Sequence, residues 1–173
     1  MTELLTLYQN NIKERILELC SAVQKCIRRG LEEDALRFAL ELETLNKTAL
    51  WNRLKIIASE DIGPANPFMP LLVDVLEKQY LHEGLDNARL IFLSNAVVCL
   101  CRSSHSRVTD DLLNVVLLEK KQIPIPDFAL DMHTARGRAM GRGWKEFFEE
   151  GSQLVNESGT NPYRERHKKL QNL

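Results

Sequence analysis

The sequence predicts an all-α fold: a single-domain helical bundle followed by an irregular C-terminal extension. Apolar residues recur every three or four positions over most of the first 120 residues, which is the period of a helix with one buried face. No run of residues alternates between apolar and polar for long enough to form a strand. A chain of 173 residues, 44% of them hydrophobic, can also bury a core without a metal or a disulfide.

Six helices are expected in the bundle, over residues 4–27, 31–45, 48–60, 67–81, 86–102 and 110–120. Gly30 ends the first helix and Gly63-Pro64 ends the third, because glycine and proline are common at and just beyond helix C-termini. Asn66 and Thr109 are expected to cap the fourth and sixth helices with their side chains. The fifth helix is apolar on most sides, which predicts a central, buried position.

The composition changes after Lys121. The segment Ile123-Pro124-Ile125-Pro126 is expected to be extended, because each proline disfavours helical backbone in the residue before it. Gly137, Gly141, Gly143 and Gly151 then leave room only for brief helices. We therefore expect a helical domain over residues 1–121, a basic extension rich in Pro and Gly packed on it over 122–155, and a polar tail over 156–173.

Charge and cysteine content exclude several classes of protein. With 23 Lys and Arg against 24 Asp and Glu, no global basic field exists to hold nucleic acid or a membrane, so any such contact is local. Cys20, Cys26, Cys99 and Cys101 lack the spacing of a zinc site, which indicates buried, reduced thiols. The N-terminus lacks the basic segment of a signal peptide, and the longest apolar run, 90–101, is too short to cross a bilayer. A soluble intracellular protein is expected, in the cytoplasm or nucleoid, or in the nucleus of a eukaryote.

The most distinctive segment runs from Arg53 to Pro67 and includes Glu60 and Asp61. These two acids fall at the C-terminal end of a helix, where the helix dipole disfavours negative charge. Their position predicts stabilising partners, either backbone N–H groups of the next helix or the side chains of Arg53 and Arg89. Two interpretations are open: a capped turn that locks two helices together, and an acidic binding site.

Written as R-L-x-x-I-A-S-E-D-I-G-x-A-x-P, this segment resembles the C-terminal region of the MgsA/RarA family of AAA+ ATPases. These are replication-associated recombination proteins related to clamp loaders. Weaker similarity on both sides extends the resemblance to about residues 19–120. It implies an all-helical domain of the clamp-loader C-terminal type, with these motif residues: Ser59, Glu60, Asp61, Ile62, Gly63 and Pro67. The chain has no G-x-x-x-x-G-K-[ST] motif, so no ATPase activity is expected of it.

The resemblance implies a non-catalytic assembly module of DNA replication or repair. In the family this region assembles subunits, commonly into tetramers. The helical domain over residues 1–121 is therefore expected to form a homo-oligomer, a tetramer or a dimer, or to dock on a separate AAA+ ATPase. No membrane partner and no cofactor are expected.

A second distinctive segment covers residues 131–144. Arginine forks match phosphate oxygens, glycines let the backbone approach an anion, and an aromatic ring can stack on a base. The functional interpretation is a weak contact with the phosphates of DNA through His133, Arg136, Arg138, Arg142 and Trp144. The alternative is a glycine-rich loop whose arginines pair with neighbouring acids, namely Glu146, Glu149 and Glu150.

Asp131 and His133, taken with His105, also allow an enzymatic alternative. An Asp-x-His pair can serve a metal or a general base, so a small metal-dependent or histidine-based hydrolase centred on His133 is the alternative function. A metal site needs three or four ligands, and His82 and His167 fall in a loop and in the tail. We therefore predict no metal site and no catalytic residue.

Overall fold

The computed structural model describes the backbone of residues 2–172 and the side chains of residues 11–172. Every regular element in this part of the chain is a helix or a helical turn, which confirms the predicted all-α class. The chain divides into two compact units, Met1–Lys120 and Lys121–Leu173. The expected packing of residues 122–155 on the helical domain stays a prediction.

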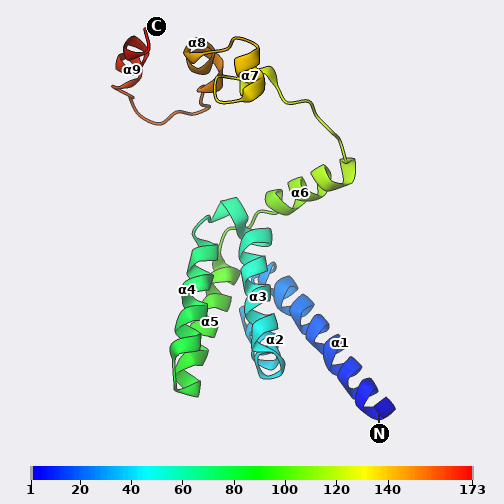
Figure 1. Ribbon diagram of the computed structural model, residues 1–173. Helices are drawn as coiled ribbons and strands as arrows, with labels where there is room; N and C mark the ends of the chain where they lie inside the picture. The colour runs from blue at the N-terminus through cyan, green and yellow to red at the C-terminus, as the bar shows by residue number, and fades with distance from the viewer. Residues whose placement is uncertain (1, 173) are drawn as a thin grey trace. The chain divides into compact units, whose positions relative to one another are not determined.

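The first unit is a helical bundle followed by a further helix, α6 (Figure 1). Helices α1 and α2 pack against each other, as do α4 and α5, and α3 contacts all four. The sixth helix contacts the two short turns that follow α3. In chain order the elements are α1 (Thr2–Ile27), α2 (Glu32–Leu45), α3 (Lys47–Ile57), the π-helical turn η1 (Ala58–Ile62), the 3-10 turn η2 (Gly63–Ala65), α4 (Met69–His82), α5 (Asp86–Arg102) and α6 (Val108–Glu119).

The core of the first unit follows from the helical spacing of its apolar residues. Leu19, Val23 and Ile27 recur every four residues on α1 and are all buried. At the centre, the rings of Trp51 and Tyr80 lie with their centroids 5.2 Å apart. The same spacing on α2 to α5 buries Ala35, Ala39, Leu42, Leu50, Leu54, Ile57, Val73, Leu76, Leu93, Ala96, Val97 and Leu100.

The fifth helix is central but not buried on most sides. It contacts α1, α2, α3 and α4, as expected of a central helix. Burial is confined to the face that carries Leu93 and Leu100, whereas Ile91 on another face is 63% exposed. The expectation of near-complete burial was wrong because apolar composition does not require that every face of a helix be covered.

Both predicted side-chain caps were wrong. Helix α4 begins at Met69, two residues beyond Pro67, and the amide of Asn66 instead donates to the hydroxyl of Ser103 at 3.3 Å. Thr109 lies inside the first turn of α6, against the backbone of Gly63, so its hydroxyl is used for packing between segments. In both places a long-range contact replaced the local hydrogen bond that the sequence favours.

Two of the four thiols are buried as predicted. Cys20 and Cys101 are buried, whereas Cys26 and Cys99 are half-buried, and all four are free. Burial raises the pKa of the Cys101 thiol to about 11, so this sulfur stays protonated at neutral pH. None of the described helices has both the length and the apolar composition needed to cross a membrane.

The second unit consists of short elements joined by loops. They are the 3-10 turn η3 (Asp127–Ala129), α7 (Ala135–Ala139), α8 (Trp144–Glu146), the π-helical turn η4 (Phe147–Gly151) and α9 (Arg164–Leu170). The brief helices among the glycines confirm the prediction for this segment. Within the expected polar tail, residues 164–170 form the short helix α9.

An aromatic cluster is the core of the second unit. The ring of Trp144 stacks on Phe148 with centroids 5.9 Å apart and meets Phe147 edge-on at 5.6 Å. The imidazole of His133 packs against Phe147 at 5.1 Å, and that of His167 from α9 packs against Phe148 at 5.0 Å. Aromatic pairs at such distances stabilise a small unit beyond the area that they bury.

Candidate functional site

The motif from Ser59 to Pro67 forms the turn between α3 and α4. The π-helical turn η1 places Asp61 and Ile62 in the interior, at 1% and 0% exposure, while Ser59 stays exposed. Gly63 follows with φ of +45°, a backbone conformation that residues with a Cβ rarely adopt. Pro67 lies in the exposed turn before α4. The motif is therefore part buried and part exposed.

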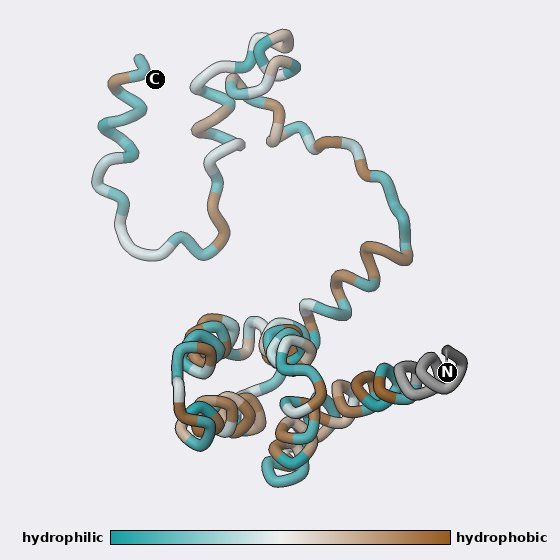
Figure 2. Tube along the Cα trace, turned by 60° about the horizontal axis from the view of Figure 1, so that its bottom comes forward, coloured by the Kyte–Doolittle hydropathy of each residue, from teal (hydrophilic) through white to brown (hydrophobic). Residues whose placement is uncertain are grey.

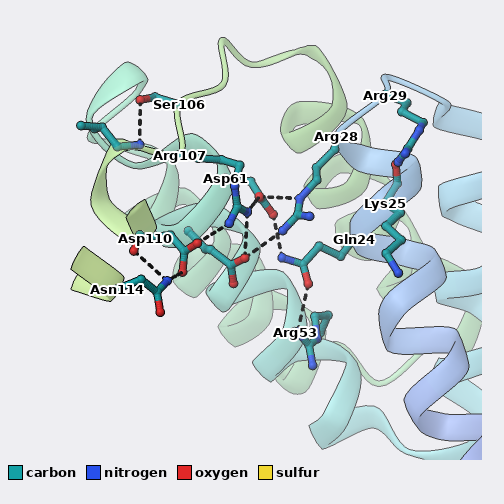
Figure 3. A network of polar contacts seen from close by, with 12 residues as sticks. Gln24, Lys25, Arg28, Arg29, Arg53, Asp61, Ser106, Arg107, Asp110 and Asn114 are labelled. Carbon is teal, nitrogen blue, oxygen red and sulfur yellow. Dashed lines mark hydrogen bonds and ion pairs between the residues drawn. The ribbon is translucent and has the colours of Figure 1, made fainter. Parts of the chain in front are cut away.

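The Asp61 carboxylate is buried at the centre of a polar network whose arginines reach the surface (Figure 3). Its Oδ2 atom accepts a hydrogen bond from Gln24 Nε2 at 2.8 Å, and Oδ1 accepts from Arg28 Nε at 2.6 Å. Arg107 Nη1 also donates to Oδ1, at 3.0 Å. Behind Gln24, Arg53 Nη1 donates to its side-chain oxygen at 3.0 Å. A buried carboxylate is stable only with such charged and polar partners.

Glu60 and the backbone of Asp61 extend the network to α6. Glu60 Oε1 accepts from Arg28 at 2.8 Å and from Arg107 at 3.0 Å, and Arg107 also pairs with Asp110 in the first turn of α6. The carbonyl of Asp61 accepts the backbone N–H of Ser106 at 2.8 Å. The motif thus joins α1 to the loop that leads into α6, which supports a turn that locks helices together.

The partners predicted for the two acids were wrong. Arg53 contacts them only through Gln24, and Arg89 donates instead to the buried carboxylate of Glu43 at 3.2 Å. The side chains that donate to the Asp61 carboxylate are instead Gln24 and Arg28, four residues apart on α1, and Arg107, which precedes α6. The one signal in the sequence is that spacing, because residues i and i+4 share a helix face.

A groove and an exposed apolar helix lie beside this network. The groove has a volume of about 390 Å³ and runs between α3 with η1 on one side and α6 on the other. Its lining residues are Lys55, Ile56, Ser59, Glu60, Thr109, Asp110 and Leu113. No residue of α6 is buried among those described, although six of the seven residues from 112 to 118 are apolar. Figure 2 shows the brown of apolar residues along this helix.

In the second unit the structure brings Asp131 and His133 together. The backbone N–H of His133 donates to the Asp131 carboxylate at 2.9 Å, and the imidazole Nδ1 lies 3.1 Å from its other oxygen. These two contacts, the backbone bond first, lower the pKa of Asp131. The imidazole also packs into the aromatic cluster, which favours a structural role for the pair. In the described part of the chain, no three His, Cys, Asp or Glu residues are grouped to hold a metal.

The three arginines of the second unit have different environments. Arg142 is 16% exposed, pairs with Asp127 and Glu150, and donates to the carbonyls of Asp127 and Leu130, so it holds the loop together. Arg138 is exposed and donates to one carbonyl, that of Met132. Arg136 is exposed on the same short helix. Residues two apart on a helix do not face each other, so Arg136 and Arg138 do not converge on one point.

Gly137 and Trp144 have structural contacts in the same unit. A Cβ on Gly137 would lie 2.0 Å from the carbonyl oxygen of Asp131, so only glycine allows this close approach. The ring of Trp144 is half-buried within the aromatic cluster. Of the residues expected to touch phosphate, His133, Arg136 and Arg138 are exposed, whereas Arg142 and Trp144 are half-buried or less.

Replacing Asp61 with Asn should strongly destabilise the first unit. The neutral amide cannot balance Arg28 and Arg107, and breaking a buried ion pair costs about 3–5 kcal/mol. We expect a loss of that size in the free energy of unfolding by urea, followed through Trp51 fluorescence in a Trp144→Phe background.

The matched control for this experiment is Asp74→Asn, which removes an exposed pair with Lys78 on α4. Exposed pairs contribute about 0–1 kcal/mol, so this control should stay close to the wild type. Equal losses in the two variants would show that the Asp61 network does not stabilise the fold.

Comparison with known proteins assigns no family to the chain. No protein-family model matches it, and no curated protein matches it.

Proposed function

We propose that this chain is a non-catalytic assembly module, which associates with a second copy of itself or docks on a separate AAA+ ATPase of DNA replication or repair. The observation that carries this proposal is the exposed surface of α6. On this helix every large apolar side chain is at least half exposed: Val108, Leu112, Leu113, Val115, Val116, Leu117 and Leu118, at 51% to 79%.

Such a surface is costly in water and favours association. Helices that are apolar on all sides are normally buried, and contiguous apolar patches on a protein surface mark contacts with other molecules. Burying one Val or Leu side chain contributes about 1.5–3 kcal/mol, so a few of these residues could supply most of the affinity of a micromolar contact.

The resemblance of residues 53–67 to the MgsA/RarA family adds a second line of support. The motif forms the turn that connects α3 to α4 and holds the loop before α6 through Arg107 and Ser106. Because Asp61 is buried within its own chain, it supports the assembly surface from beneath and does not itself form the contact. We propose α6 and the adjoining groove as the contact surface.

Replacing Val116 with Lys should abolish association. A buried ammonium group without a partner is strongly unfavourable, so the dissociation constant should rise at least about a hundredfold. Sedimentation velocity over about 1 to 100 μM would measure the change. Leu71→Lys on α4 is the control, because Leu71 is 62% exposed and Val116 is 60% exposed.

Two results together would overturn the proposed function. One is a wild-type chain that stays monomeric over the whole concentration range. The other is the absence of a complex with a purified ATPase of the MgsA/RarA type under the same conditions.

We also propose a weak contact between the second unit and DNA phosphates. The supporting observation is that Arg136 and Arg138 expose their side chains, whereas Arg142 is held by carbonyls and acids of its own unit. With two contacts in place of three, affinity is low and comes mainly from the release of counterions.

Substitutions of the three arginines in the second unit should have two different effects, one on DNA binding and one on stability. Arg136→Ala with Arg138→Ala should abolish DNA binding, whose log–log salt dependence in the wild type has a slope of about −2. Arg142→Ala should instead lower the stability of the second unit, measured through Trp144 fluorescence in a Trp51→Phe background. Wild-type protein that binds no DNA at low salt would refute the contact.

A further inference from the structure

One face of α6 combines apolar side chains with a charge at its end. Thr109, Leu113, Val116 and Lys120 are spaced by four, three and four residues, so they lie in one stripe along the helix. Thr109 and Leu113 line the groove beside α3, and Val116 continues the stripe with 60% of its surface exposed. Lys120, just past the last turn, has an exposed side chain and forms no ion pair with the described residues.

The two ends of this stripe carry opposite charge. At the N-terminal end, the carboxylates of Glu60 and Asp110 line the groove, and Asp111 follows on α6. Among the described residues, Glu60, Asp110 and the buried Asp61 share only two guanidinium groups, those of Arg28 and Arg107, so this end keeps an excess of negative charge. At the C-terminal end, Lys120 is followed by Lys121. The helix dipole adds partial charges that a neighbouring helix of opposite direction would complement.

We infer that a second copy of this chain lays its own α6 antiparallel along this stripe, in the groove beside α3. This inference rests on the proposed assembly function and names its partner and geometry. Antiparallel pairing places Leu113 of one copy opposite Val116 of the other, and Thr109 opposite Lys120. The ammonium group of each Lys120 then lies at the acidic end of the other copy's groove.

Symmetry and charge both favour this arrangement. A two-fold contact uses the same surface on both copies, so every apolar residue of the stripe and every Lys120 contributes twice. In a parallel pair the two Lys120 side chains would lie side by side, and the acidic ends would also meet, which is unfavourable. Complementary ends therefore select the antiparallel direction.

The first arm of the test reverses one charge. Lys120→Glu adds a carboxylate to the acidic end of the partner's groove twice in each dimer, so the dissociation constant should rise about tenfold at low salt and less at about 1 M salt. Lys13→Glu changes net charge equally at an exposed position on α1 and should leave the constant unchanged. In a parallel dimer Lys120→Glu would exchange one like-charged pair for another and would not weaken association.

The second arm uses the unmodified protein and a carbodiimide, which joins a carboxylate directly to an amine. Within one chain, Lys120 lies nine or ten residues from Asp111 and Asp110, which is about 13–15 Å along a helix and too far for such a bond. A cross-link from Lys120 to either acid, found by mass spectrometry, must therefore join two copies. Mixing ¹⁵N-labelled and unlabelled chains confirms that assignment.

The possible outcomes distinguish a failure of antiparallel pairing from a failure of the proposed assembly function. Weaker association of Lys120→Glu together with the Lys120 to Asp110 or Asp111 cross-link supports antiparallel pairing. A wild-type dimer that lacks the cross-link, or that Lys120→Glu leaves unchanged, overturns the pairing while the assembly function stands. A chain that remains monomeric but binds a purified AAA+ ATPase also overturns the pairing and keeps the function.

Discussion

The buried charge of Asp61 is the constraint on which the first unit depends. A carboxylate in the interior must be matched by nearby positive charge and hydrogen-bond donors, because water cannot reach it. Arg28 and Gln24 supply these groups from α1, and Arg107 supplies another from the loop before α6. Satisfying this one carboxylate therefore fixes α1, the turn after α3 and the start of α6 relative to one another.

That constraint explains how α6 can be held at one end and still expose apolar side chains along its length. Arg107 connects Glu60, Asp61 and Asp110, so the first turn of α6 is fixed against the bundle. Beyond this turn the helix has no buried residue among those described. A firmly held base with an uncovered apolar surface is the arrangement that a contact between molecules requires, since little ordering entropy is then lost on association.

The sequence was most informative where local physics decides the structure. The period of apolar residues located α1 to α6 to within a few residues, and the glycines and prolines placed the breaks between them. The pairing of Asp131 with His133 could also be anticipated, because the two residues are close in sequence. In these places no distant contact competes with the local preference.

The sequence was least informative where distant segments meet. Nothing local indicates that Arg28 and Arg107, 79 positions apart, would share one carboxylate, or that Arg142 would bind carbonyls and not phosphate. The caps at Asn66 and Thr109 failed for the same reason, because both side chains are used between segments. The outer faces of α5 and α6 also have the apolar composition of a buried helix, although neither face is covered within the unit.

The most direct test of the central role of Asp61 is amide hydrogen exchange at Ser106. Its N–H donates to the carbonyl of Asp61 at 2.8 Å, at the point where the loop before α6 joins the buried turn. If the network fixes this junction, the amide should exchange only when the whole first unit unfolds, with the same free energy as the core amides of α3. Exchange at the rate of an open loop would show that α6 is not held by the Asp61 turn.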